Sequence, residues 1–179
     1  MSTTYPEVYE PAGIDSRGNV ALFWVATLAK PNAPTVTELS KAVNLSKVAY
    51  RWDMAGTQNS TERGHYASQN ALKSLGRIQY DPSELEYDYD PQKLETPDDE
   101  YKHVKALVAG AKGFLIDRRG IPASEPFKAG QILEAVMPVE LGERFPVEAG
   151  FASEEGSKLR YRQTVSVVGD VLRGVAIAS

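Results

Sequence analysis

The chain of 179 residues contains no cysteine and only two histidines. The lack of cysteine excludes disulfides, thiolate zinc sites and cysteine nucleophiles. A long hydrophobic run is also missing, because the longest predominantly apolar stretch, residues 20–29, falls well short of the roughly 20 residues that cross a bilayer. Glu7, Glu10 and Asp15 precede this stretch with only Arg17 of opposite charge, whereas a secretory signal begins with positive charge. We therefore expect a protein that is soluble where it is made.

An excess of positive charge is missing as well. Lysine and arginine total 20 and aspartate and glutamate 24, a net charge of −4. This balance argues against a simple basic DNA-binding domain, for which a pI above about 9 is expected. Hydrophobic residues at 42% and charged residues at 25% are ordinary for a globular protein and exclude wholesale disorder. We expect an N-terminal arm over residues 1–18, which hold prolines and glycines without periodicity, and one domain over residues 19–179.

Most of the patterning is typical of β-strands. Residues 20–29 are apolar at even and odd positions alike, which indicates a strand buried on both faces. A second strand is predicted over about 43–54, with a register slip near Lys47 through a bulge. Residues 55–76 then lose the pattern and are predicted to form a long loop that orders against a partner. Later strands are predicted over residues 84–90, 113–117, 131–141, 158–167 and 171–177, with residues 118–120 forming a turn.

Signals for helices are few. Glu38 follows Thr35 by three residues, a capping-box spacing that predicts a short helical turn. Thr96 and Pro97 form a stronger helix start, and the apolar stripe of the helix that follows runs over residues 101–111. The predicted fold class is therefore mainly β (α+β), a β-sandwich or barrel of about seven strands with one flanking helix.

The most distinctive stretch of the chain is an acidic strand. Residues 81–100 hold nine acidic side chains and only Lys93, a net charge of −8, so the other 159 residues sum to +4. Alternate side chains of a strand point to opposite faces. One face of this strand is therefore expected to pack through Leu85, Tyr87 and Tyr89, and the other carries four carboxylates, those of Glu84, Glu86, Asp88 and Asp90.

The sequence gives little sign of catalysis or metal binding. Same-face residues of a strand are about 6.6 Å apart, too far for four carboxylates to bind one ion. The spacing would suit the paired acids of a glycoside hydrolase, but no aromatic sugar-binding groove is recognisable. We interpret His65 as a solvated loop residue and His103 as a surface or boundary residue. The sequence has no phosphate-binding loop or nucleophile elbow, and we expect no cofactor, no metal and no enzymatic activity.

The order of these features resembles a known family. The apolar first strand is followed by NAPTVTEL at residues 32–39 and VNLS at 43–46, and the acidic strand by LVAGAKGFLIDRRG at 107–120 and VSVVGDV at 165–171. This arrangement is similar to the major tail tube proteins of long-tailed (siphovirus-type) bacteriophages, especially those of actinobacterial hosts. The resemblance spans most of residues 18–177.

The resemblance implies a structural virion protein. Six subunits would form a ring, and rings would stack into a hollow tube through which the DNA genome passes. The fold would be shared with the tubes of type VI secretion systems and contractile tails. Expected partners are further copies of the chain, other tail proteins such as tape measure, terminator and tail-tip proteins, and double-stranded DNA in transient, non-specific passage. The tail would assemble in the bacterial host cytoplasm, with no membrane binding by this chain.

Within this picture, we hypothesise that the face bearing Glu84, Glu86, Asp88 and Asp90 lines the channel, because carboxylates repel the DNA backbone. The alternative is a solvated outer surface. Four arginines are predicted to make charge contacts between subunits: Arg118, Arg119, Arg160 and Arg162. Two other functions remain open, a tail terminator or head–tail joining ring protein and a monomeric ligand-binding β-barrel. An enzyme would require His65 or His103 to lie buried beside a carboxylate in a deep pocket.

Overall fold

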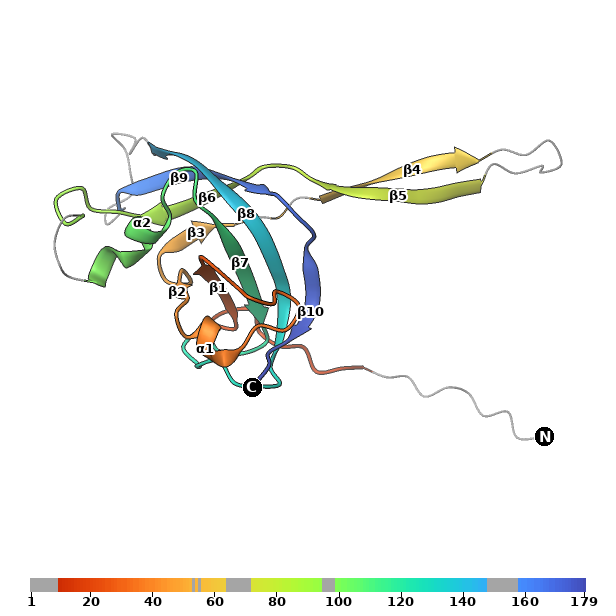
Figure 1. Ribbon diagram of the computed structural model, residues 1–179, viewed down its shortest axis with the longest axis horizontal. Helices are drawn as coiled ribbons and strands as arrows, with labels where there is room; N and C mark the ends of the chain where they lie inside the picture. The colour runs from red at the N-terminus through yellow and green to blue at the C-terminus, as the bar shows by residue number, and fades with distance from the viewer. Residues whose placement is uncertain (1–9, 53, 55, 64–71, 95–98, 148–157) are drawn as a thin grey trace.

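The computed structural model describes residues 10–52, 54, 56–63, 72–94, 99–147 and 158–179. A curled antiparallel sheet forms the body of the molecule, and a two-stranded hairpin projects from it (Figure 1). The strands of the body are β1 (Val20–Val25), β2 (Val43–Asn44), β3 (Ala49–Arg51), β6 (Ser83–Asp88), β7 (Lys112–Arg119), β8 (Ile132–Pro146), β9 (Arg160–Val167) and β10 (Leu172–Ala176). Their hydrogen-bonded order is β2-β1-β7-β8-β9-β6-β3, and β10 also pairs with β8.

The sheet curls because two consecutive strands lie at its opposite ends. Residues 45–48 alone separate β2 from β3, yet β2 pairs with β1 at one end of the sheet and β3 with β6 at the other. Leu45 is fully buried in this connection, and its carbonyl accepts hydrogen bonds from the amides of Val48 and Ala49. The predicted continuous strand over 43–54 is therefore wrong. Near Lys47, where a slip was expected, the chain crosses from one end of the sheet to the other.

Both faces of the curled sheet are apolar. The inner core lies inside the curl and includes Leu22, Trp24, Leu85, Tyr87, Leu115 and Met137. The outer core lies on the opposite face and includes Ala21, Phe23, Val25, Ile116, Val136 and Val175. β1 contributes alternate residues to the two cores, which confirms a strand buried on both faces, although it ends at Val25. Burial of each large apolar side chain stabilises the fold by roughly 1.5–3 kcal/mol.

A short helix, α1 (Val36–Leu39), covers part of the outer core through Leu39. The predicted capping box is confirmed, because the Thr35 hydroxyl accepts from the Glu38 amide at 3.3 Å and a Glu38 carboxylate oxygen accepts from the Thr35 amide at 2.9 Å. The bonds that the Glu38 carboxylate accepts from the Thr35 amide, the Ala29 amide and the Thr35 hydroxyl hold its pKa below the usual value.

In the stretch predicted as a long loop, the described residues form two paired strands of a β-hairpin. β4 (Gly56–Arg63) pairs with β5 (Leu72–Tyr80) in a separate two-stranded sheet. The described side chains over 56–62 and 73–79 are all exposed. Alternation of apolar and polar residues arises only when one face of a strand is buried. Over the described residues 56–62 and 73–79, the hairpin buries neither face within its own chain, so the sequence signal for strands is absent there.

The helical region after the acidic strand is shorter than predicted. A 3₁₀ turn, η1 (Asp99–Tyr101), leads into α2 (Lys102–Ala106), while the predicted start at Thr96 and Pro97 lies outside the described residues. The helix stops early because Gly110 and Ala111 bond to the backbone of Leu141 on β8. The described chain thus has ten strands and two short helices rather than about seven strands and one helix. None of the described helices is long and apolar enough to span a membrane.

Candidate functional site

The acidic row of β6 faces a basic row on β9 and on the residues just before it. Arg162 lies 3.6 Å from Glu84, Arg160 lies 3.3 Å from Glu86, and Lys158 lies 3.1 Å from Asp88. In the register of the two strands, each acid pairs with the basic residue two positions before its direct partner in the sequence. We call these six residues the charge ladder. Asp90 stands apart from it and accepts a hydrogen bond from the amide of Gln92.

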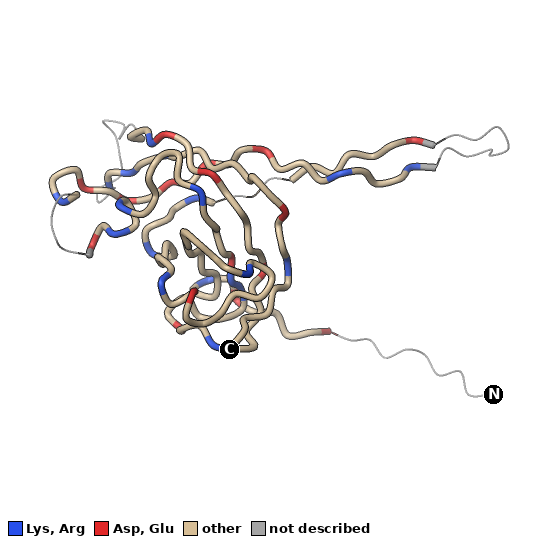
Figure 2. The backbone as a smooth tube through the Cα atoms, viewed as in Figure 1, with Lys and Arg blue, Asp and Glu red and all other residues tan. Residues whose placement is uncertain are grey.

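The charge ladder lies on the outside of the curl. Leu85 and Tyr87 of the same strand belong to the inner core, so their neighbours point the other way. The exposed fraction of the acidic side chains falls along the strand, from 42% at Glu84 to 16% at Glu86 and 9% at Asp88. Acidic and basic positions lie close together over the body (Figure 2). The ladder therefore has no net charge, although the sequence suggested a face of carboxylates alone.

His103 is buried rather than at the surface, so that prediction is wrong. Its Nε2 donates to the backbone carbonyl of Asp88 at 2.7 Å, and its ring lies between those of Tyr87 and Tyr101. The short α2 turns both His103 and Val104 toward the sheet. Burial lowers the pKa of His103. His65, the other histidine, lies outside the described residues.

Arg118 is fully buried under the segment 120–131. Its guanidinium lies 5.3 Å from the Phe23 ring and 5.0 Å from the Phe127 ring. Nη2 donates to the backbone carbonyls of Pro122 and Glu125 at 2.9 and 2.8 Å. The predicted turn at 118 is wrong, because β7 continues through Arg119. The contacts of Arg118 are thus with its own chain, and burial lowers its pKa.

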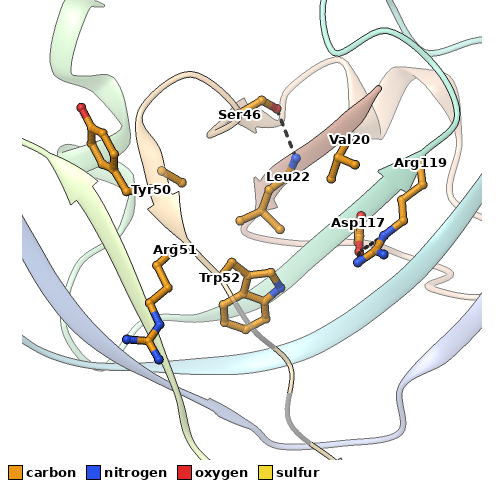
Figure 3. Close-up of a pocket in the computed structure, with 9 residues that line it drawn as sticks. Val20, Leu22, Ser46, Tyr50, Arg51, Trp52, Asp117 and Arg119 are labelled. Carbon is orange, nitrogen blue, oxygen red and sulfur yellow. Dashed lines mark hydrogen bonds and ion pairs between the residues drawn. The ribbon is translucent and has the colours of Figure 1, made fainter. Parts of the chain in front are cut away.

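The two ends of the curled sheet do not meet, and a pocket lies between them (Figure 3). β1 pairs with β2 only at Phe23 and Trp24, and β3 pairs only with β6 among the described strands. We call the gap the seam pocket. It has a volume of about 170 Å³ and is lined by Val20, Leu22, Ser46, Ala49, Tyr50, Arg51, Trp52, Asp117 and Arg119.

Asp117 forms the polar floor of the seam pocket. It is buried, and its Oδ2 accepts from Nη2 of Arg119 at 2.8 Å and from Nε at 2.9 Å. This carboxylate raises the pKa of Arg119. Oδ1 of Asp117 is buried and has no hydrogen-bond partner among the described residues. A buried acceptor without a donor is unfavourable.

A second pocket shares Trp52 with the first. It has a volume of about 200 Å³, is also lined by Asp117 and Arg119, and extends to Glu134 and Arg173. Both volumes lie below the roughly 300 Å³ at which small-molecule sites usually begin. The described residues hold no group of three acidic or histidine side chains that could bind a metal ion. The dimensions therefore suit a protein side chain or a short extended segment.

The sequence predictions and these sites overlap only partly. The structure brings Arg160 and Arg162 to the acidic row in the same chain and places Arg119 at the seam pocket. The seam pocket itself was missed. A signal was available in Asp117, which follows an apolar run at an inward-facing position two residues after Leu115. The approach of Arg51 and Trp52 could not be seen, because it depends on the closure of the sheet.

Comparison with known proteins identifies the family. The sequence model described as "Phage tail tube protein" matches residues 9–179. The chain belongs to the phage tail tube protein family. Among solved structures, it is similar to a chain in the cryo-EM structure of the anti-feeding prophage baseplate, 6-fold symmetrised, with 7% identity and a TM-score of 0.46 over 92% of this chain and 98% of that chain. No curated protein sequence is significantly similar.

The family confirms the resemblance that the sequence suggested. The structure confirms the predicted mainly β fold class. A tail tube protein is a structural component of the phage tail and hence of the virion.

Proposed function

We propose that the chain forms hexameric rings that stack into a hollow tail tube, and that the DNA genome passes through this tube. The tube would be assembled in the host cytoplasm together with tape measure, terminator and tail-tip proteins. The proposed role is structural, without catalysis or a cofactor. The observation that carries the proposal is the projecting hairpin of β4 and β5, whose described side chains over 56–62 and 73–79 are all exposed.

The hairpin has the properties of an element that needs a neighbour. A two-stranded sheet alone is marginally stable in water, and unpaired strand edges are templates for further strands. Neither β4 nor β5 pairs with another described strand. Leu75 and Ile78 are 72% and 55% exposed and offer apolar anchors on a largely polar surface. A projecting element that fits a different surface of the next copy gives open stacking rather than a closed pair.

The charge ladder supports a role for this face in the channel wall. A protein gains non-specific affinity for DNA when free lysines and arginines displace the counterions of phosphates. In the ladder, Lys158, Arg160 and Arg162 are each paired with a carboxylate of the same chain. A wall built in this way would hold little net attraction for a passing duplex. The alternative, a solvated outer surface, predicts no effect of these residues on DNA.

The ladder hypothesis can be tested by changing Glu84, Glu86, Asp88 and Asp90 to glutamine. We expect ring and tube assembly to persist if this face lines the lumen, because no neighbouring subunit then contacts it. Lys158, Arg160 and Arg162 would lose their partners and face the lumen as free cations. Assembled tubes of the variant should retain DNA in co-sedimentation, and retention should fall steeply as salt rises. Phages that carry it should eject DNA poorly. Loss of rings by the folded variant would contradict the assignment of the acidic face to the lumen.

Electron microscopy of the concentrated protein tests the proposed function as a whole. We expect hollow tubes of indefinite length in negative stain. Single rings would instead support a terminator or head–tail joining protein. A species of about 20 kDa at every concentration and salt in light scattering would support a monomeric β-barrel and overturn the proposal.

The contribution of the hairpin can be isolated with a matched pair of variants. Leu75→Glu and Ile78→Glu together should abolish or strongly reduce tubes, because the two anchors would be charged where a neighbour packs. The control places the same charge at two polar hairpin positions, Thr57→Glu and Thr61→Glu. Equal tube yield from both double variants would contradict a role of the apolar anchors in stacking.

A further inference from the structure

A β-bulge makes the hairpin more one-sided than its sequence suggests. In the register of β4 and β5, Gln58 lies opposite Ile78 and Ser60 lies opposite Leu75. Gln58 and Ser60 are two residues apart and therefore point to one face, whereas Leu75 and Ile78 are three residues apart. β5 thus has one more residue than β4 between the two pairs, which defines a bulge. The bulge turns both apolar anchors of the hairpin to the same face.

Two glycines of the hairpin confirm which residues share a face. A Cβ on Gly76 would lie 3.1 Å from the carbonyl oxygen of Asn59 and 3.8 Å from its Cβ, so both residues lie on the face opposite the anchors. A Cβ on Gly56 would lie 3.1 Å from the Tyr80 ring and 3.7 Å from Cγ2 of Ile78. Tyr80 therefore joins Ile78 on the face of the anchors, where Gly56 leaves room for its ring.

The two faces of the hairpin differ in chemistry. On one of them, which we call the anchor face, Leu75, Ile78 and Tyr80 form an apolar stripe across from Gly56, Gln58 and Ser60. The opposite face, the polar face, holds polar groups alone among the described side chains: Thr57, Asn59, Thr61, Ser74, Arg77 and Gln79. One apolar and one polar face are typical of an antiparallel sheet that packs on one side only.

The body of the same chain does not cover the anchor face. β4 and β5 project away from the curled sheet (Figure 1), and the side chains over 73–79 are all exposed. Leu75 and Ile78, at 72% and 55% exposure, are among the large apolar side chains that the described chain leaves in water. Apolar groups gathered on one exposed face mark a surface that another molecule buries.

The body of a second copy has the charge that complements the hairpin. Residues 56–80 hold three basic side chains and one acidic, a net charge of +2. Since the whole chain has a net charge of −4, the rest of each copy carries −6. Opposite charges favour contacts of a hairpin with a body over contacts between two hairpins. DNA would be held through the basic side chains rather than through an apolar stripe.

We infer that the hairpin packs on the body of a neighbouring copy through the anchor face alone, while the polar face stays in water. Leu75, Ile78 and Tyr80 provide the apolar contact, and the bulge at Gly76 sets their common orientation. The bulge also hides this one-sidedness from the sequence, because apolar residues three apart do not alternate. The inference rests on the proposed function and deepens it by naming the surface that the hairpin uses.

Exchanges of neighbouring residues test the inference without a change of composition. Ser74→Leu combined with Leu75→Ser moves one anchor to the polar face, and the yield of tubes should fall by roughly tenfold or more. The matched control exchanges the residues across from them on β4, Ser60→Thr with Thr61→Ser, and should leave the yield nearly unchanged. All four positions are exposed, so the body should fold in both variants. A normal yield from the first exchange would overturn the inference and leave the proposed function intact.

Thiol labelling of the full chain compares the two faces directly, because the chain has no cysteine of its own. Ser60→Cys places a thiol on the anchor face, and Asn59→Cys places one on the polar face a single residue away. Between dilute monomer and assembly, labelling by a maleimide should slow by roughly tenfold or more at position 60 and change by less than about threefold at position 59.

The outcomes of the labelling separate the inference from the proposed function. Tubes in which both positions are slowed equally, or in which position 60 is protected only after DNA is added, would overturn the inference alone. Single rings that protect position 60 but not position 59 would support the inference and refute the proposed tube. A chain that stays monomeric at every concentration would overturn both.

Discussion

The body and the hairpin of this molecule are both antiparallel β-structure, but they differ in how far their side chains are buried. In the body, strands such as β1 and β8 bury side chains in one or both cores. In the hairpin, every described side chain from Gly56 to Glu62 and from Lys73 to Gln79 is exposed. The difference teaches that hydrophobic alternation reports the burial of a strand rather than its existence. A strand whose faces are covered only by another subunit shows no such alternation in its own sequence.

The largest effect on stability is expected at Gly113 of the body, where a side chain has no room. A Cβ on Gly113 would lie 2.6 Å from the Trp24 ring and 2.7 Å from the carbonyl oxygen of Val25. The backbone of β1 cannot yield, so Gly113→Val should lower the free energy of unfolding by about 3 kcal/mol or more, or prevent folding. In the hairpin, Gly76→Ala should change it by less than about 1 kcal/mol. Denaturant unfolding of both variants measures these effects. Similar losses of stability would contradict the contrast between the body and the hairpin.

Truncation of apolar residues sharpens the same contrast. Leu115 is fully buried in the inner core, so Leu115→Ala should lower the free energy of unfolding by about 2–5 kcal/mol. Ile78 is 55% exposed in the hairpin, and Ile78→Ala should change monomer stability by about 0.5 kcal/mol or less. Sedimentation of tubes should show the reverse order among folded protein, with Ile78→Ala the more harmful. A core-like loss of stability from Ile78→Ala would show that the hairpin packs on its own body.

A pH dependence of stability, of intermediate size, is expected from His103 in the body. Burial lowers the pKa of His103 below the ordinary value of 6.5, so the unfolded chain binds a proton more readily than the folded chain. This contribution to stability is complete above pH 6.5 and is lost as pH falls toward the lowered pKa, with a slope of at most about 1.4 kcal/mol per pH unit. His103→Gln can keep the bond to the Asp88 carbonyl and should remove the slope. An unchanged slope in thermal unfolding would contradict the buried neutral state of His103.

The smallest effect is expected in the charge ladder. Glu84 is 42% exposed and its pair with Arg162 is long at 3.6 Å, so Glu84→Gln should lower stability by less than about 1 kcal/mol. Asp88 is nearly buried and paired with Lys158, and Asp88→Asn should have the larger effect. Urea titrations of the two variants at low and high salt would reveal the order. Equal losses of stability that do not depend on salt would contradict the expectation that the ion pairs of the ladder weaken as their exposure rises.

Much of the body could be predicted from the sequence, because its signals are local. The capping box at Thr35 and Glu38, the doubly buried β1 and the alternation of β6 each depend on neighbours within a few residues. The split of the strand predicted over 43–54 could not be predicted, because it depends on which two strands form the ends of the sheet. The helix after residue 98 was overestimated, because Gly110 and Ala111 pair with Leu141, which is distant in the sequence.

The site was harder to predict than the fold for a related reason. The acidic and basic rows were both visible in the sequence, but the register that joins Glu86 to Arg160 is set by strand pairing. The seam pocket combines Asp117, Arg51 and Trp52 from strands that come together only when the sheet curls.

Amide hydrogen exchange of the hairpin tests most directly whether its missing partner is another copy. Exchange of residues 56–63 and 72–80 is compared between dilute monomer and sedimented tubes, with β7 as an internal reference protected in both. In the monomer, the hairpin should exchange within about tenfold of an unfolded chain. In tubes its exchange should slow by at least about 100-fold, as expected for strands that gain hydrogen-bonded neighbours. Equal exchange of the hairpin in monomer and tube would contradict the proposal that it is completed by assembly.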